Sequence, residues 1–594
     1  MTIFAGIFSR HARAPISDAA CDALRRALSR QAHEPAQEFR DERVFLAKVD
    51  LHIFDTPAFL VRDGASVALL AGEPLLRPAD GATAATRSDD LARLQREWDD
   101  GDWSALRRTR GVFCAVHYSR EPCLLTLVTD KLGLRPLYYW IDDDRVLFAT
   151  ALRILEQHPD VPKRMDLRAV TEMANLGVPL ADRTPYAGIR VLRAAEVLRV
   201  SPSLAQGSCY WRWDEIPPSS RPEPELLSLV YERFQAAVAC RLRGDTAAVA
   251  FLSGGLDSRC IVAALRDQRA AVHSFNFSMP RTQDRALGAA FARAAGAVHH
   301  ERPTLPEPEP PYHALLANAL RELALEPAPR HPRRVWSGDG GSVALGHVYL
   351  TRTMIDRQRA GDREGAIAAY LEQQRAAVLR RLLQPPIAAA LDGILKRGVR
   401  EELADTHCAD PGRALHIFLL LNDQRRHLTR HFEDIDLHQL ELQLPFFDSD
   451  FLEAVLTVPI DRCLYHAFYA KWLDRFPPVV TAVPWQTYPG HVPCPLPTPE
   501  RLHYQWTMGR DRALRASFKR AQARRAAEML RAERFPRDVL NKGVLRLAGW
   551  LHRAGIRDYG YVIRQASLYY TYWLRNSGDW VAPPAGPTPD VVAR

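Results

Sequence analysis

The residues best suited to chemistry form the run Ser253-Gly254-Gly255-Leu256-Asp257-Ser258. Two adjacent glycines allow the backbone to turn sharply and to direct successive N–H groups at phosphate oxygens. The hydroxyls of Ser253 and Ser258 can donate to the same anion, and Asp257 is placed to hold Mg²⁺, which prefers one or two carboxylates together with phosphate oxygens. The run lacks the Gly-Lys-Ser/Thr ending of a Walker loop. It predicts a phosphate-binding turn of another type, with a purely structural Gly-Gly turn as the alternative.

The segments around this run predict a strand before it and a helix after it. Residues 247–252 are apolar, and residues 259–266 have the pattern of a helix whose N-terminus adds partial positive charge. Further short apolar runs follow at 272–277, 297–300 and 334–337, with helical stretches between them. Strands that alternate with helices indicate a parallel, doubly wound sheet.

The chain divides at a proline-rich segment. Residues 1–211 contain short runs of β-branched and aromatic residues closed by turn-formers, which indicate a strand-rich domain. Residues 212–225 hold four prolines and show no apolar periodicity, as is typical of a linker. Residues 226–580 then form the second domain, almost entirely helical beyond about residue 355. The Pro-rich residues 581–594 are expected to be a disordered tail.

The amino-acid composition of the chain restricts the classes of function that it could have. No stretch approaches the roughly 18 apolar residues that a membrane span needs. Nine cysteines without a Cys-x-x-Cys pair indicate neither a zinc site nor a disulfide framework, so we expect a cytoplasmic protein. A net charge of +9 does not indicate a nucleic-acid partner. Much of the basic excess lies in residues 512–537, for which a solvated helix face is the simpler interpretation and an anion-binding surface the other.

Several motifs in one order resemble the asparagine synthetase family of N-type ATP pyrophosphatases. Besides the Ser253 to Ser258 run, they are residues 273–277, the loop 337–342, the segment 441–448 and the segment 130–139. The resemblance covers residues 1 to about 490. It implies an α/β chain with an N-terminal Ntn-hydrolase-like, glutaminase-like α+β domain. The C-terminal domain is implied to be a parallel-sheet ATP pyrophosphatase with added helices, which uses ATP and Mg²⁺.

The resemblance also implies particular site residues. Asp257 is implied as the metal ligand. Asp339 matches a catalytic position of the β-lactam synthetases, and we take Asp339 and Glu441 as candidate general bases, because neighbouring buried carboxylates tend to have raised pKa values. The residues implied to bind ATP are Ser253, Gly254, Gly255, Leu256, Asp257, Ser258, Phe275, Asn276, Ser337, Gly338 and Gly340.

Four residues differ from the family pattern, and these differences narrow the activity that we expect within the family. Thr2 stands where a glutamine-using member has its nucleophilic cysteine, and Ala71 replaces the asparagine that helps form the oxyanion hole. We therefore expect an inactive glutaminase domain. Ser342 replaces a second Mg²⁺-binding aspartate, with Asp339 as a possible substitute, and Thr487 falls near the family's pyrophosphate-stabilising lysine. The sequence does not identify the cation that replaces this lysine.

Members with an inactive glutaminase domain include β-lactam synthetases and the lasso-peptide macrolactam synthetases, or lasso cyclases. Residues 340–346, 422–427 and 485–494 look like the lasso cyclases, and the insertion at 347–430 would widen the mouth of the site. The resemblance implies adenylation of an Asp or Glu side chain of a precursor peptide, followed by ring closure with the peptide's N-terminal amine. A leader peptidase is the implied partner. A β-lactam-synthetase-like ligase of small molecules, an asparagine synthetase and an inactive peptide-binding scaffold are the alternatives.

Overall fold

The N-terminal half is a sandwich of two antiparallel sheets. The computed structural model describes residues 2–11, 15–31, 36–77, 86–302, 312–499, 501–504 and 512–583. In spatial order, the first sheet contains β11 (Arg190–Val191), β8 (Tyr138–Ile141), β9 (Arg145–Ala149), β1 (Thr2–Ser9), β3 (Val44–Asp50) and β2 (Ala36–Arg40). The second contains β13 (Ala205–Cys209), β12 (Glu196–Val200), β7 (Leu124–Thr129), β6 (Phe113–Ser119), β5 (Ser66–Gly72) and β4 (Phe59–Arg62).

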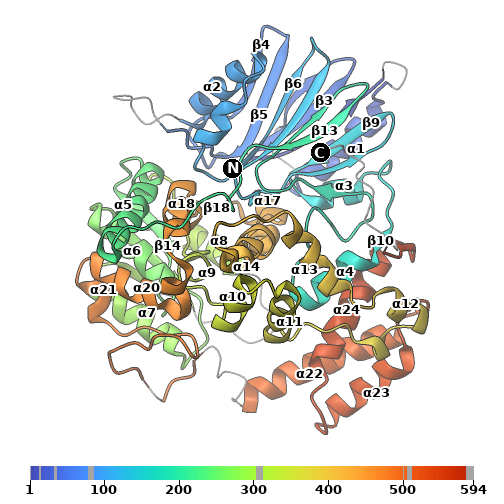
Figure 1. Ribbon diagram of the computed structural model, residues 1–594. Helices are drawn as coiled ribbons and strands as arrows, with labels where there is room; N and C mark the ends of the chain where they lie inside the picture. Colours follow the sequence, from blue (N-terminus) through green and yellow to red (C-terminus); the bar gives the residue numbers. More distant parts are fainter. Residues whose placement is uncertain are drawn as a thin grey trace.

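Both faces of the first sheet are covered. Along β1, Phe4 and Phe8 point into the core between the two sheets, whereas Ile3 and Ile7 join the core beneath helix α1 (Asp18–Leu28). This alternation follows from the two-residue period of a strand. Helix α2 (Arg87–Asp99) covers the outer face of the second sheet. The predicted strand-rich domain is confirmed as a four-layer α/β sandwich (Figure 1).

The C-terminal half is built on one parallel sheet. Its spatial order is β16 (Val298–Glu301), β15 (Ala271–Asn276), β14 (Ala247–Phe251), β17 (Arg334–Trp336) and β18 (Glu441–Gln443). The chain runs from β14 outward to β16 on one side, and then returns to place β17 and β18 on the other side. The order therefore reverses between β14 and β17. Ligands of open parallel sheets bind at such a switch point, outside the carboxyl ends of the strands.

Helices cover this sheet as the sequence predicts. Helix α5 (Glu223–Leu242) includes the last three residues of the predicted linker, so the irregular connection ends earlier than expected. The helices next to the strands are α6 (Asp257–Asp267), α7 (Gln283–Ala294) and α8 (Tyr312–Glu322). The remaining helices that shape the site are α9 (Gly341–Ala344), the π-helix Leu419–Gln424, α15 (Arg425–His427), α16 (Thr429–Glu433), α17 (Ile435–His438) and α20 (Ala467–Trp472). The expected parallel-sheet domain with added helices is confirmed.

The last helices do not pack on the parallel sheet. Helices α22 (Arg512–Arg531), α23 (Lys542–Arg553) and α24 (Gly560–Arg575) share a separate core with α4 (Leu167–Leu176) from the N-terminal half (Figure 1). Strand β19 (Trp580–Val581) pairs with β10 (Met165–Asp166). Val581 is therefore ordered, and the expected tail beyond residue 583 lies outside the described residues. No helix within the described ranges is long and apolar enough to cross a membrane.

Candidate functional site

The predicted phosphate loop lies at the switch point of the parallel sheet. Ser253 to Ser258 connects the end of β14 to the start of α6, and residues 337–340 connect the end of β17 to α9. Because β14 and β17 are hydrogen-bonded neighbours, the two loops meet at the same edge. The glycines allow this approach: a Cβ on Gly338 would lie 2.6 Å from the Ser258 nitrogen, and one on Gly341 would lie 2.7 Å from Asp257 Cγ. A larger side chain at either position would push the loops apart.

Hydrogen bonds within the loop fix its shape. Ser258 Oγ accepts from the Ser253 N–H at 2.9 Å and lies 2.9 Å from Ser253 Oγ. Ser253 Oγ also accepts from the Gly255 N–H at 3.2 Å, and Asp284 accepts from the Gly254 N–H at 2.8 Å. The loop is thus preorganised around its own N–H groups. Asp284, at the start of α7, accepts from one of these N–H groups.

Asp257 is the best-supported carboxylate of the site. It accepts from Ser342 through both the backbone N–H at 3.0 Å and Oγ at 2.8 Å, and from the Tyr469 hydroxyl at 2.7 Å. Burial raises its pKa to about 6, while the bonds from Tyr469 and Ser342 oppose that shift. Ser342, expected as a lost metal ligand, therefore orients the carboxylate that remains. Tyr469 lies over two hundred residues away in sequence, and no local pattern marked it.

A cavity of about 800 Å³ opens beside these loops. Its walls include Ser253, Asp257, Ser258, Phe275, Asn276, Ser337, Gly338, Asp339 and Gly340, which are nine of the residues predicted to bind ATP or act on the substrate. Aromatic side chains that were not predicted complete the lining: Phe251, Phe277, Tyr312, Tyr349, Tyr488 and Phe518. Of the other predicted loop residues, Gly255 and Leu256 line a smaller neighbouring cavity of about 160 Å³, and Gly254 is not among the lining residues of either cavity.

The donor set suits a divalent cation. Asp257, Asp284 and Asp339 all line the large cavity, and no lysine or arginine is among its described lining residues. Three carboxylates with no neighbouring cation favour binding of a metal ion that also contacts phosphate oxygens. Asp257 fits the role of an Mg²⁺ ligand best, because its orientation is fixed by three hydrogen-bonding groups. Asp339 has different hydrogen-bond partners from those of Asp257.

Asp339 forms a dyad with a histidine. Its Oδ1 lies 2.9 Å from Nε2 of His427, and its Oδ2 accepts from Ser337 Oγ at 2.5 Å. Burial would raise the pKa of Asp339, but the hydrogen bonds from His427 and Ser337, together with the charges of His427 and His313, outweigh burial and hold this pKa below its ordinary value. The same bond raises the pKa of His427. The expectation of a raised pKa at Asp339 is therefore wrong, because its partner is a histidine rather than a second carboxylate.

Glu441 faces the N-terminal domain. Its Oε1 accepts from Arg135 Nη1 at 2.8 Å, and Arg135 Nη2 donates to the Thr2 carbonyl at 3.2 Å. Arg135 and Glu441 are 2% and 5% exposed, and Glu441 is not among the residues that line either cavity. The structure thus does not bring the two candidate bases, Asp339 and Glu441, together in the cavity.

The N-terminal position expected to have lost its nucleophile is closed. Thr2 is fully buried, and its Oγ1 accepts from Arg87 Nη1 at 3.2 Å. Arg87 also donates to Asp50 at 2.6 Å, next to the buried Lys48. Ala71, at the place of the expected oxyanion donor, is fully buried in β5. A cluster of charged side chains therefore surrounds Thr2.

The small cavity contains the unpredicted residues nearest to the phosphate loop. Ser253, Asp257 and Ser342 form one wall, and residues 486–488 form another with His466 and His491. Thr487 lies in this lining, so the position that departs from the family lysine is close to the loop, as the resemblance implied. His466 stood in no motif, and His491 stood in the segment 485–494 without a predicted role, so only the fold shows that both lie beside the loop.

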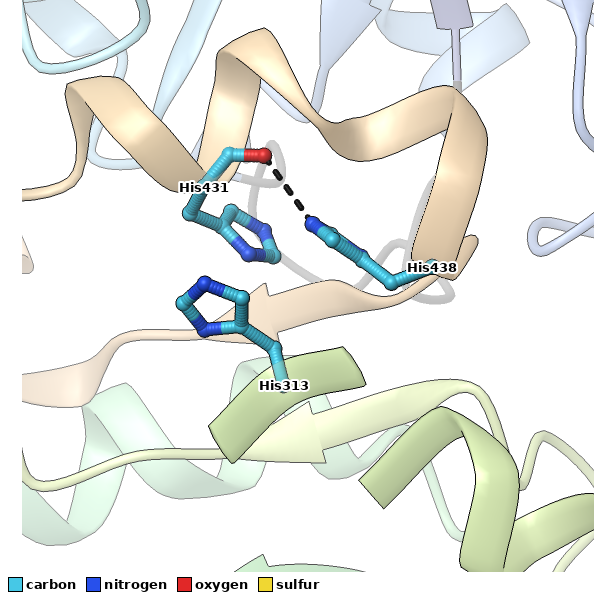
Figure 2. A group of neighbouring side chains, drawn as sticks. All are labelled: His313, His431 and His438. Carbon is cyan, nitrogen blue, oxygen red and sulfur yellow. Dashed lines mark hydrogen bonds between the residues drawn. The ribbon is translucent and has the colours of Figure 1, made fainter. Parts of the chain in front are cut away.

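A separate group of buried histidines packs together (Figure 2). His313 comes from α8, and His431 and His438 come from α16 and α17; their ring nitrogens lie within 4.8 Å of one another. His438 Nε2 donates to the His431 carbonyl at 3.1 Å, and its Nδ1 accepts from the Leu440 N–H at 3.2 Å. Both nitrogens of His438 are thus engaged, and burial lowers its pKa to about 4. We assign the group to neutral core packing.

Comparison with known proteins identifies two domains. Residues 76–211 match a glutamine amidotransferase domain, and residues 229–315 match asparagine synthase. Asparagine synthetase (glutamine-hydrolyzing) 3 of Bacillus subtilis (strain 168) is 25% identical over 238 residues, which cover 36% of this chain and 38% of that protein. A putative asparagine synthetase (glutamine-hydrolyzing) 2 of Methanocaldococcus jannaschii is 24% identical over 189 residues, which cover 31% and 36%. The alignments thus span less than two fifths of either relative.

A solved structure of the allosteric regulatory enzyme of purine biosynthesis also aligns with the chain. It is 14% identical, with a TM-score of 0.24, and the alignment covers 52% of this chain and 82% of that one.

Proposed function

We propose that the chain, which matches a glutamine amidotransferase domain over residues 76–211 and asparagine synthase over residues 229–315, is an ATP-dependent amide ligase of the asparagine synthetase kind that releases AMP and pyrophosphate. The observation that carries the proposal is the pair of glycine loops at the switch point, with the buried Asp257 carboxylate held between them. Positioning and charge stabilisation are what attack of a carboxylate on the α-phosphorus of ATP requires. The loop N–H groups and hydroxyls supply the positioning. Asp257 would hold Mg²⁺, which neutralises phosphate charge when bound.

The second step needs a proton acceptor for the attacking amine. The dyad of His427 and Asp339 offers one at the wall of the large cavity, with a His427 side chain that is 48% exposed. We propose that neutral His427 takes the amine proton at Nδ1, directly or through water, because its Nε2–H donates to Asp339. Asp339 then stabilises the imidazolium that forms, as a carboxylate does beside a catalytic histidine. This replaces Asp339 alone as the base and makes it the positioning partner.

We propose a peptide as the acyl and amine donor, so that the product is a macrolactam closed by an isopeptide bond. Three features support a substrate other than ammonia and aspartate. Thr2 is buried under Arg87, which removes the source of ammonia. The large cavity has a volume of about 800 Å³, toward the upper end of the range of ligand pockets. Its lining from the inserted segment 347–430 includes Val348, Tyr349, Gln424 and His427. A precursor peptide and a leader peptidase are the partners of this proposal.

Asparagine synthesis is the second candidate, because the relatives that match the chain carry that name. One experiment separates the two. Purified protein is incubated with ATP and Mg²⁺, either with aspartate and ammonia or with a candidate precursor peptide from a neighbouring gene. Loss of one water mass from the peptide, together with AMP, supports the macrolactam proposal. Asparagine formation in place of peptide cyclisation assigns the chain to the second function.

A further inference from the structure

The small cavity beside the phosphate loop contains a paired histidine. Nδ1 of His466 lies 2.6 Å from Nδ1 of His491, and Nε2 of His466 lies 3.4 Å from Ser342 Oγ. At 2.6 Å one Nδ1 must carry the hydrogen while the other offers its lone pair. Nε2 of His466 faces Ser342, so Nε2 of His491 is the outer nitrogen of the pair that remains for another partner. Through Ser342 the pair is linked to Asp257, so it stands two hydrogen bonds away from this carboxylate.

The backbone that presents His466 is strained. Tyr465 and His466 both lie in the left-handed region, with φ of 57° and 63°. Each such conformation costs a non-glycine residue on the order of 1–3 kcal/mol, and strain of this kind gathers at functional sites. Gly346 leaves room for the imidazole ring, because a Cβ at this position would collide with the His466 ring. Ordinary packing would place a glycine or asparagine at position 466.

Two tyrosine rings enclose His466. Tyr469 stacks on one side with ring centroids 5.6 Å apart, and Tyr488 stacks at 5.4 Å and an interplanar angle of 15°. The face of an aromatic ring attracts a cation, and the attraction grows when water is excluded. The sandwich therefore favours the imidazolium form of His466. In the unliganded cavity burial outweighs this effect and lowers the pKa of His466 to about 3 and that of His491 below its ordinary value.

The ability of His466 and His491 to become positively charged indicates what the pair binds. Neither cavity is lined by lysine or arginine within the described ranges, so His466 and His491 are the cationisable groups on this side of the loop. We propose that the His466–His491 pair binds the phosphate oxygens of the pyrophosphate released on adenylation, and takes up one proton when that anion enters the small cavity. The inference rests on the proposed function and names the residues that hold its leaving group. The pair is neutral while the cavity is empty and becomes charged when the anion is present.

Proton uptake must be assigned against the other titratable groups that face the pair. They are Asp257, Asp284, His347, Tyr465, Tyr469, Tyr488 and Tyr504. Burial raises the pKa of Tyr469 and of Tyr488 above the ordinary value, so both stay neutral near pH 7. Burial raises the pKa of Asp257 to about 6 and holds the pKa of His347 well below its ordinary value. A pyrophosphate anion would raise the proton affinity of the histidine pair most, because both histidines line the cavity that the anion would enter.

Titration calorimetry with magnesium pyrophosphate tests the inference on the full chain. Measured at pH 7 in buffers of different ionisation enthalpy, the wild-type protein should absorb about one proton for each pyrophosphate bound. His491→Gln keeps the size of the side chain and removes the imidazole. His466→Asn keeps a residue that tolerates positive φ. Each variant should bind pyrophosphate roughly tenfold to a hundredfold more weakly, in line with the loss of one charged hydrogen bond, and should lose the proton uptake.

His52→Gln is the matched control, because His52 is exposed in the N-terminal domain, and it should bind as the wild type does. Unchanged affinity and unchanged proton uptake in both His466→Asn and His491→Gln would overturn the inference, as would a wild-type protein that does not bind pyrophosphate. The binding measurement needs no peptide. A protein that binds pyrophosphate with proton uptake but cyclises no peptide therefore disproves the peptide substrate and leaves the histidine pair standing.

Discussion

Asp339 and His427 lie 2.9 Å apart and join two walls of the large cavity. Asp339 belongs to the loop after β17, and His427 ends α15, directly after the π-helix Leu419–Gln424. An insertion of one residue into a helical turn is costly and is often found at functional sites. Here it sets the turn from which His427 reaches Asp339.

Asp339→Asn separates the two half-reactions. The side chain keeps its size, so ATP binding and pyrophosphate exchange should stay within a few-fold of the wild type. Ring closure should slow by roughly a hundredfold or more, because His427 loses the carboxylate that stabilises its protonated form. Exchange and single-turnover ring closure are measured side by side. A parallel fall in both would instead make Asp339 an Mg²⁺ ligand, and persistence of both would exclude the dyad.

The dyad also predicts a pH dependence. His427 acts as a base only when neutral, so the rate of ring closure should rise with pH through its pKa, which Asp339 holds above the ordinary value. Asp339→Asn lacks the carboxylate that raises the pKa of His427. The acidic limb of the pH–rate profile should therefore move to lower pH, and the plateau rate of ring closure should fall. His427→Gln should remove the limb altogether. A limb that stays in place in Asp339→Asn would show that another group titrates.

The sequence was informative about the phosphate loop for a physical reason. The turn Ser253 to Ser258 satisfies local rules, in which a buried strand, two glycines and a helix start occur within a dozen residues. The strands and their parallel order follow from the same alternation. Site partners that are distant in sequence obey no local rule. Tyr469 and Ser342 reach Asp257 only after the sheet has brought the two loops together.

For Glu441 the sequence motif was recognisable, but the partner of its side chain could not be predicted. Its motif matched the family, yet its side chain is held by Arg135 from the other domain, and nothing in the sequence around residue 441 indicates that partner. The packing of α22 to α24 on α4 was missed for the same reason, since an amphipathic helix shows which of its faces is buried but not against which element.

Asp257→Ala should abolish adenylation and leave the fold intact. The carboxylate is the acceptor for Ser342 and Tyr469 and the best-oriented metal ligand of the site. Both hydroxyls lose their acceptor in the variant, but they line or adjoin solvent-filled cavities and can bond to water. Pyrophosphate exchange is the measurement, with circular dichroism as the check on folding. Exchange near the wild-type rate would show that this loop does not hold the nucleotide.

The protein should not hydrolyse glutamine. Thr2 is buried and accepts from Arg87, and Ala71 offers no side-chain donor. Removing one oxyanion donor typically costs about a hundredfold or more, and here the nucleophile is also inaccessible. We expect no glutamate release above background, and Thr2→Cys should not create it. Glutamate release that disappears in Thr2→Ala would show a working N-terminal site.

Arg135 and Glu441 should stabilise the contact between the domains. Both are almost fully buried, so removing one partner leaves the other charged and unpaired at a cost of about 3–5 kcal/mol. Arg135→Met and Glu441→Leu should each lower the unfolding temperature, while the double variant should be more stable than the sum of the two predicts. Glu441→Gln tests the alternative role. If Glu441 acts only as a hydrogen-bonding partner of Arg135, Glu441→Gln should retain ring closure in the folded fraction. If Glu441 is a general base, the variant should lose ring closure with little change in stability. Thermal unfolding and single-turnover ring closure on the same preparation distinguish these outcomes, and the structure, in which Glu441 lines neither cavity, favours the first.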